Sequence, residues 1–246
     1  MSIGSRRGGN GQWGLVLAAM IGAAWLAVHI GGIFFWQWTR TTAPLAVIVV
    51  LLQAWLSTGL FIIAHDCMHG SLAPDRPSLN TAVGTVCLGA YAGLSYAALL
   101  PNHHAHHAAP GTADDPDFHA AAPKRALPWF ISFFRNYYTH GQIARITVAA
   151  IVYLVLGASL LNIVVFWAVP ALLALAQLFV FGTYLPHRHD DQPFADAHNA
   201  RGSELTPVSS LITCFHFGAY HHEHHLNPGT PWWMLPALRR EKLTQR

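Results

Sequence analysis

Four long apolar runs divide this 246-residue chain and predict most of its helices. They cover residues 13–36, 44–64, 146–161 and 163–185. A helix of roughly 20 apolar residues crosses the hydrocarbon core of a bilayer, which is about 30 Å thick. Only a few residues join the two runs of each pair, so the pattern predicts two hairpins of transmembrane helices.

The polar segments between and after these runs are rich in histidine. Three clusters, in residues 65–69, 103–107 and 221–225, hold ten of the chain's 17 histidines. Within each cluster the spacing is i and i+4, or i, i+3 and i+4, which places the side chains on one helix face. Neutral imidazole is a ligand for iron, zinc and copper. The clusters therefore predict one polynuclear metal site built from distant segments.

Nine histidines are the candidate metal ligands. His187 joins the clusters because it follows the apolar run 163–185 and therefore lies in the same layer as the cluster histidines. His216, five residues before the last cluster, competes with His187 for the ninth position. The predicted set is His65, His69, His103, His106, His107, His187, His221, His224 and His225.

A fifth apolar run, residues 79–100, is rich in glycine. If this run crossed the bilayer, residues 103–107 would lie on the opposite side from His65 and His69, and one shared site would be impossible. We therefore expect an interfacial or re-entrant helix pair, which is tolerated where protein covers the backbone. A fifth span, with separate roles for the histidine clusters, is the alternative.

The distribution of charge orients this arrangement. Arg40 is placed on the far side of the membrane, and the other 13 of the 14 Lys and Arg residues lie on the side of both termini and all three clusters. Cytoplasmic loops carry such an excess. The sequence thus predicts an all-α integral membrane protein, a single domain over residues 1–246, with four transmembrane helices, interfacial or re-entrant helices and a cytoplasmic histidine-rich cap.

Composition supports the membrane assignment and narrows the metal chemistry. Charged residues make up 10% of the chain, against roughly 25% in soluble domains. No basic and aromatic array points to nucleic acid, and the three cysteines form no metal or redox motif. The chain has only three glutamates, too few for a carboxylate-bridged di-iron bundle. Two metal ions held mainly by imidazole remain, with iron favoured over copper for oxygen activation on an apolar substrate.

The histidine boxes resemble those of the integral-membrane fatty acid desaturase/hydroxylase superfamily. Longer strings are similar to bacterial and cyanobacterial β-carotene ketolases: HDCMHG at residues 65–70, DDPD at 114–117, FGTYLPHR at 181–188 and FHFGAYHHEHH at 215–225. The resemblance covers roughly residues 12 to 240. The three boxes alone indicate only the superfamily, and the longer strings indicate the ketolases.

This resemblance implies a non-haem di-iron oxygenase of a bacterial inner membrane. It would use O2 and an external donor such as reduced ferredoxin to oxidise C4 of a β-ionone ring to a ketone, taking a carotenoid substrate from the bilayer. β-Carotene would give echinenone and then canthaxanthin through two hydroxylations at one carbon. Alternatives on the same scaffold are a carotenoid 3-hydroxylase, a fatty acid desaturase and an alkane hydroxylase. A histidine-rich membrane metal transporter is the alternative of a different class.

Acidic residues near the clusters are the remaining candidates for the site. Asp66, Asp117 and Glu223 are predicted to act with the metal centre, and Asp114 is a further candidate, because carboxylates that accept the second ring N–H of a histidine ligand fix its orientation. Ordinary loop or capping acidity is the alternative for each. The aromatic and glycine-rich residues of 84–96 and 129–138 are expected to line an apolar channel for a polyene.

Overall fold

The structure is a computed structural model that describes residues 4–244, and within that range it is helical and contains no strand. The prediction of an all-α protein is confirmed. In chain order the helices are α1 Gly4–Ile30, η1 Gly31–Phe35, α2 Thr42–Met68, α3 Pro77–Ala92, α4 Tyr96–Ala108, α5 Ala126–Tyr137, α6 His140–Val155, α7 Leu160–Ile163, η2 Val164–Ala168, α8 Val169–Leu178, η3 Phe179–Tyr184, α9 Leu185–His187, α10 Pro207–Cys214, α11 Phe217–Leu226, η4 Trp232–Met234 and α12 Leu235–Thr244.

Three described helices are long and apolar enough to cross a membrane: Gln12–Phe35, Thr42–Met68 and Leu160–His187. The third is continuous from α7 to α9, although it passes through two π-helical stretches, which are frequent at functional sites. Helices α3 and α4 would make a fourth span if they were counted as one. Helix α6 is apolar but shorter, with 16 residues.

Helices α3 and α4 are bent by 102° at residues 93–95. Gly93 has a φ of 64°, a conformation that glycine adopts without strain, and a Cβ there would lie 3.0 Å from Ile146. Helix α6 holds this bend, because Gln142 Nε2 donates to Ala92 O at 2.9 Å and Arg145 Nε donates to Gly93 O at 2.8 Å. The chain therefore turns sharply before α4, which carries the second histidine cluster.

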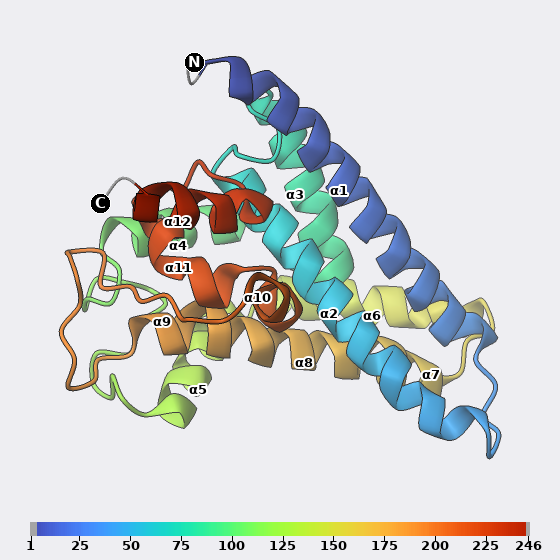
Figure 1. Cartoon of the computed structure of the whole chain (residues 1–246). Coiled ribbons are helices and arrows are strands. Elements are labelled where there is room, and N and C mark those ends of the chain that lie inside the picture. The colour runs from blue at the N-terminus through green and yellow to red at the C-terminus, as the bar shows by residue number, and fades with distance from the viewer. Residues whose placement is uncertain (1–3, 245–246) are drawn as a thin grey trace.

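The two helical hairpins are joined at the end of the molecule that lies away from α4, α9 and α11 (Figure 1). Asn162 connects them: its Oδ1 accepts from Trp38 Nε1 at 2.7 Å, and its Nδ2 donates to Ile33 O at 3.2 Å. The turn between α6 and α7 lies at residues 156–159. The apolar runs 146–161 and 163–185 placed it slightly later, at Asn162. Gly157, with φ 93°, allows this earlier turn.

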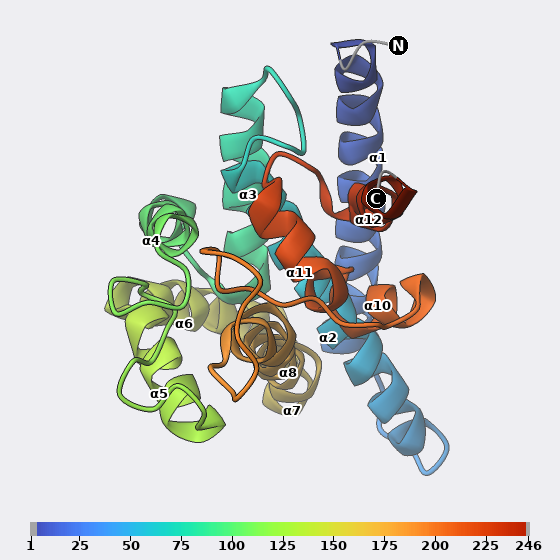
Figure 2. The same ribbon diagram turned by 60° about the vertical axis from the view of Figure 1, so that its left-hand side comes forward.

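A turn between α10 and α11 sets the direction of α11, which carries the last histidine cluster. Phe215 and His216 both have positive φ, at 46° and 73°, which costs energy for residues other than glycine. Phe215 is buried, stacks on Trp55 with ring centroids 4.5 Å apart, and lies against Gly59. Packing of this ring holds the strained turn, and α11 then runs between α4 and α12 (Figure 2).

Candidate metal centre

A first group of histidines forms where α2, α4 and α11 meet. The ligand nitrogens of His65, His69, His107 and His224 all lie within 4.8 Å of one another. His103 adjoins this group, because its Nε2 is 2.7 Å from Nε2 of His69 and its ring centroid is 4.4 Å from that of His65. Helical spacing places the partners from each helix on one face, and the bend before α4 brings the faces together.

A second group lies beside the first, between α4, α9 and α11. It contains His106, His187, His221 and His225, again with ligand nitrogens within 4.8 Å of one another. His187 Nε2 is 2.8 Å from His221 Nε2, which is 3.0 Å from His225 Nε2. The rings of His107 and His225 stack at 4.4 Å and join the two groups. The structure thus brings together all nine histidines singled out in the sequence.

Two of these imidazoles have their tautomer set by a fixed acceptor. His106 Nδ1–H donates to both carboxylate oxygens of Asp115, each at 3.0 Å, and His187 Nδ1–H donates to the carbonyl of Asn199 at 2.8 Å. The Nε2 lone pair of each ring is therefore free to face the other histidines. This arrangement orients histidine ligands in metal proteins.

Four rings outside the apolar helices favour the neutral form. Burial, and then the charge of neighbouring imidazoles, lowers the pKa of His221, His224 and His225 well below its ordinary value. The same two causes lower the pKa of His69 to about 3. Neutral imidazole is the form that binds a metal ion, so these rings are ready to ligate near neutral pH.

This donor set fits two transition-metal ions. Several Nε2 atoms approach one another to 2.7–3.1 Å, a separation that imidazoles reach when they share a proton or a metal ion. Nine imidazoles exceed the four ligands of a structural zinc and the three of a catalytic zinc. Two adjacent groups, of five and four histidines, match a pair of ions.

The predicted acidic residues fall into different environments. Asp66 is buried and accepts from the backbone N–H of Trp232 at 3.1 Å, with Oδ1 3.8 Å from His65 Nδ1. Asp117 accepts from the Tyr137 hydroxyl and lies 3.9 Å from His106 Nδ1. Burial raises the pKa of Asp117 to about 6. Both carboxylates are therefore next to ligand candidates.

Glu223 does not join the centre. Its oxygens accept from Arg239 Nε at 2.6 Å and Nη2 at 2.8 Å, and Arg239 also donates to the carbonyl of Ser203 at 2.9 Å. Burial opposes ionisation, but the guanidinium outweighs it and holds the pKa of Glu223 below its ordinary value. The pair ties α11 to α12.

Asp115 and Asn199 were missed in the sequence, while Asp114 was chosen in place of Asp115. Asp114 is exposed and Asp115 is buried. The DDPD string pointed to the segment but not to the residue within it. Asn199 acts through its backbone carbonyl, which no side-chain pattern marks. His216 lies outside both groups, bonded to Ser210 Oγ at 3.2 Å and stacked on Trp232.

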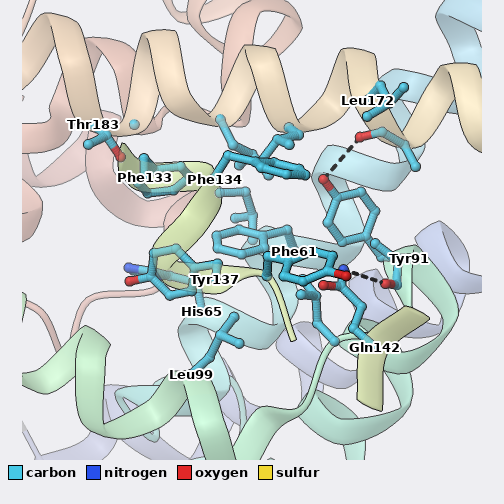
Figure 3. A pocket seen from close by; sticks show the side chains of 18 of the residues that line it. Phe61, His65, Tyr91, Leu99, Phe133, Phe134, Tyr137, Gln142, Leu172 and Thr183 are labelled. Carbon is cyan, nitrogen blue, oxygen red and sulfur yellow. Dashed lines mark hydrogen bonds between the residues drawn. The ribbon is translucent and has the colours of Figure 1, made fainter. Parts of the chain in front are cut away.

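An apolar cavity of about 380 Å³ ends at this centre. Its wall is mostly aliphatic and aromatic, and two polar groups in it are bonded to backbone: the Tyr91 hydroxyl donates to Ala171 O at 3.2 Å and Gln142 Nε2 donates to Ala92 O (Figure 3). The cavity also borders exposed side chains, among them Leu172, which is 60% exposed, and Ile143. The cavity therefore opens to the outside of the helix bundle. Five predicted ligands line it: His65, His103, His106, His107 and His221.

Fold and site together define a helical protein with membrane-length apolar helices and a cluster of histidines, suited to metal binding, that faces an apolar cavity. Residues 40–245 match the fatty acid desaturase family, and the chain belongs to that family. It is 46% identical to the Beta-carotene ketolase of Paracoccus sp. (strain N81106 / MBIC 01143), over 92% of this chain and 91% of the relative.

Two further relatives carry the same name. The chain is 45% identical to the Beta-carotene ketolase of Paracoccus sp. (strain PC1), over 92% of each chain. It is 41% identical to the Beta-carotene ketolase of Haematococcus lacustris, over 80% of this chain and 62% of the relative. These comparisons confirm the resemblance that the longer histidine strings indicated.

Proposed function

We propose that this protein is a β-carotene ketolase, which oxidises C4 and C4′ of β-ionone rings and converts β-carotene to echinenone and then canthaxanthin. The observation that carries the proposal is the position of the nine histidines at the inner end of an apolar cavity. Such a cavity suits a hydrocarbon ring, and its metal end suits oxidation. The relatives at 45–46% identity, named for this activity, support the choice of substrate.

The cofactor is proposed to be two iron ions. His65, His69, His103, His107 and His224 would hold one, and His106, His187, His221 and His225 the other. Bound iron supplies the activation of O2. The chain supplies the rest: Asp115 and Asn199 hold ligand rings in place, and the apolar wall excludes water and places C4 of the ring beside the histidines. Asp66 and Asp117 are proposed to help position His65 and His106, whereas Glu223 is left with a structural role.

The reaction balances as two hydroxylations followed by dehydration. Each hydroxylation replaces one C4–H bond by C4–OH and consumes one O2, two electrons and two protons, with release of one water. The second produces a geminal diol, which loses water to leave the ketone. A separate reduced carrier of the ferredoxin type is proposed to deliver the electrons, with O2 as co-substrate.

In the membrane we propose four spans, formed by Gln12–Phe35, Thr42–Met68, α6 and Leu160–His187, with α3 and α4 as a re-entrant pair. Helix α6 would be about 24 Å long at 1.5 Å per residue, which requires local thinning of the bilayer. Both termini and the metal centre would be cytoplasmic, in a bacterial inner membrane. The excess of Lys and Arg on that side supports this orientation.

Expression in a bacterium that accumulates β-carotene tests the proposal. The expected products are the mono- and diketone, identified by absorption and mass, with two tightly bound irons per chain in the purified protein. The His106→Ala variant should insert normally and make no ketone. A 3-hydroxylated product would replace the ketolase proposal by a 3-hydroxylase. Unchanged carotenoid together with labile zinc or copper would favour a transporter.

A further inference from the structure

The apolar cavity follows one face of the third long helix over most of its length. One row of lining residues recurs along this helix at intervals of three to five: Ile163, Trp167, Ala171, Leu175, Leu178 and Thr183. Three neighbours of this row also line the cavity: Ala168, Leu172 and Gly182. Thr183 follows Ile163 by 20 residues, which at about 1.5 Å per residue spans about 30 Å. Figure 3 shows Thr183 and Leu172 on this helix, with Phe133 beside the first and Tyr91 nearer the second. The cavity is thus long and narrow.

The two ends of the cavity have different surroundings. Thr183 is one helical turn from His187, so its end is the metal end. Ile163 and Trp167 are buried in a hydrophobic cluster with Ile33 and Phe166. This cluster lies near the hairpin turns, at the other end of the molecule. Ala150 of α6 lines the cavity and packs against the same cluster.

We propose that this far end, lined by Ile146, Ala150, Ile163, Trp167 and Ala168, is a subsite for the second end group of a two-ring carotenoid. The proposal rests on the ketolase function proposed above. A conjugated polyene is stiff and straight, so a ring held at the metal end fixes where the other ring lies. A groove of about 30 Å is long enough for an extended carotenoid of two rings. The far subsite therefore sets the preference for substrate length.

The side of the groove explains how a stiff molecule enters it. Leu172, Ala168 and Ile143 line the cavity and are exposed on the outside of the bundle. The substrate can therefore move in sideways from the hydrocarbon region instead of threading from one end. Only one ring at a time reaches the histidines, so the monoketone must leave and return in the reverse orientation before the diketone forms.

Filling the far end tests the subsite. Ala168 precedes Thr183 by 15 residues, about 22 Å along the helix, and Ala150 faces the same end from α6. Ala168→Phe and Ala150→Phe should each lower the rate on β-carotene roughly ten-fold or more, because overpacking excludes the second ring. Both variants should oxidise a one-ring apocarotenoid of half the polyene length at a rate close to that of the unmodified protein. Ala176→Phe, at an exposed position of the same helix outside the cavity lining, is the matched control and should change neither rate.

The outcomes separate the subsite from the function. If the unmodified protein oxidises neither substrate, the ketolase proposal fails. If it oxidises both and the two far-end variants keep their β-carotene rate, the subsite is wrong. The subsite is also wrong if variants that insert and bind metal normally lose the same share of their oxidation rate on both substrates. The two variants lie on different helices, so misfolding of one, seen as loss of protein from the membrane, leaves the other as the test.

Discussion

Replacing Asp115 by asparagine tests how the second histidine group is held. The Asp115 carboxylate is buried and accepts three hydrogen bonds, from His106 Nδ1–H, from the Gly111 N–H at 2.7 Å and from the Asp117 N–H at 2.8 Å. An asparagine side chain has one acceptor oxygen. Its NH2 group would therefore face at least one of these donors, and the charge that favours the His106 N–H would be lost.

The size of the effect follows from these contacts. Removing the acceptor that orients a histidine ligand costs about 10- to 100-fold in metal affinity. This corresponds to about 1.4–2.8 kcal/mol at 1.4 kcal/mol per factor of ten. Asp114→Asn is the control, because Asp114 is the adjacent residue in the chain, has the same charge and is exposed.

The assay is metal retention by purified protein in detergent, titrated with a chelator. Asp115→Asn should lose metal at a 10- to 100-fold lower chelator activity, while Asp114→Asn should follow the unmodified protein. The thermal unfolding of the metal-free proteins serves as a check that the fold is retained. Equal metal affinity for the two variants would refute the assignment of Asp115.

Three other predictions follow from the same geometry. His187→Ala should abolish ketone formation and lower bound metal, whereas His216→Ala should keep both, measured by product and metal analysis; the reverse result would exchange their roles. Gly59→Ala would place a Cβ 2.7 Å from Phe215, so it should destabilise the fold by about 1–3 kcal/mol, measured by thermal unfolding; an unchanged transition would show that the ring can move aside. A strong chelator should remove all ketolase activity, and iron, but not zinc, should restore it; restoration by zinc alone would contradict an iron centre.

Local properties of the chain were predictable from the sequence. An apolar run long enough to cross a bilayer, and histidines three or four residues apart, each depend on one helix only. The requirement that three clusters meet added a constraint from outside any one helix. It led to His187 and to an interfacial or re-entrant helix pair at residues 79–100. The structure places the nine histidines together and bends α3 and α4 by 102°.

Other features depend on which faces of distant helices and loops come into contact, and the sequence does not predict them. Asp114 and Asp115 are adjacent and chemically identical, yet the loop turns one to solvent and the other towards His106. Asn199 accepts from His187 through its backbone carbonyl oxygen, a group that every residue has.

The sequence by itself determined the long apolar helices, the histidine ligand candidates and the family, because these rest on spacing and composition along one chain. Tertiary structure decided that Asp115 holds His106, that Glu223 pairs with Arg239 and that His216 lies outside the centre. It also decided the length of the cavity, which exists only between the packed helices. The physical reason is that spacing sets which side chains share a face, whereas the contacts of that face depend on how distant helices pack.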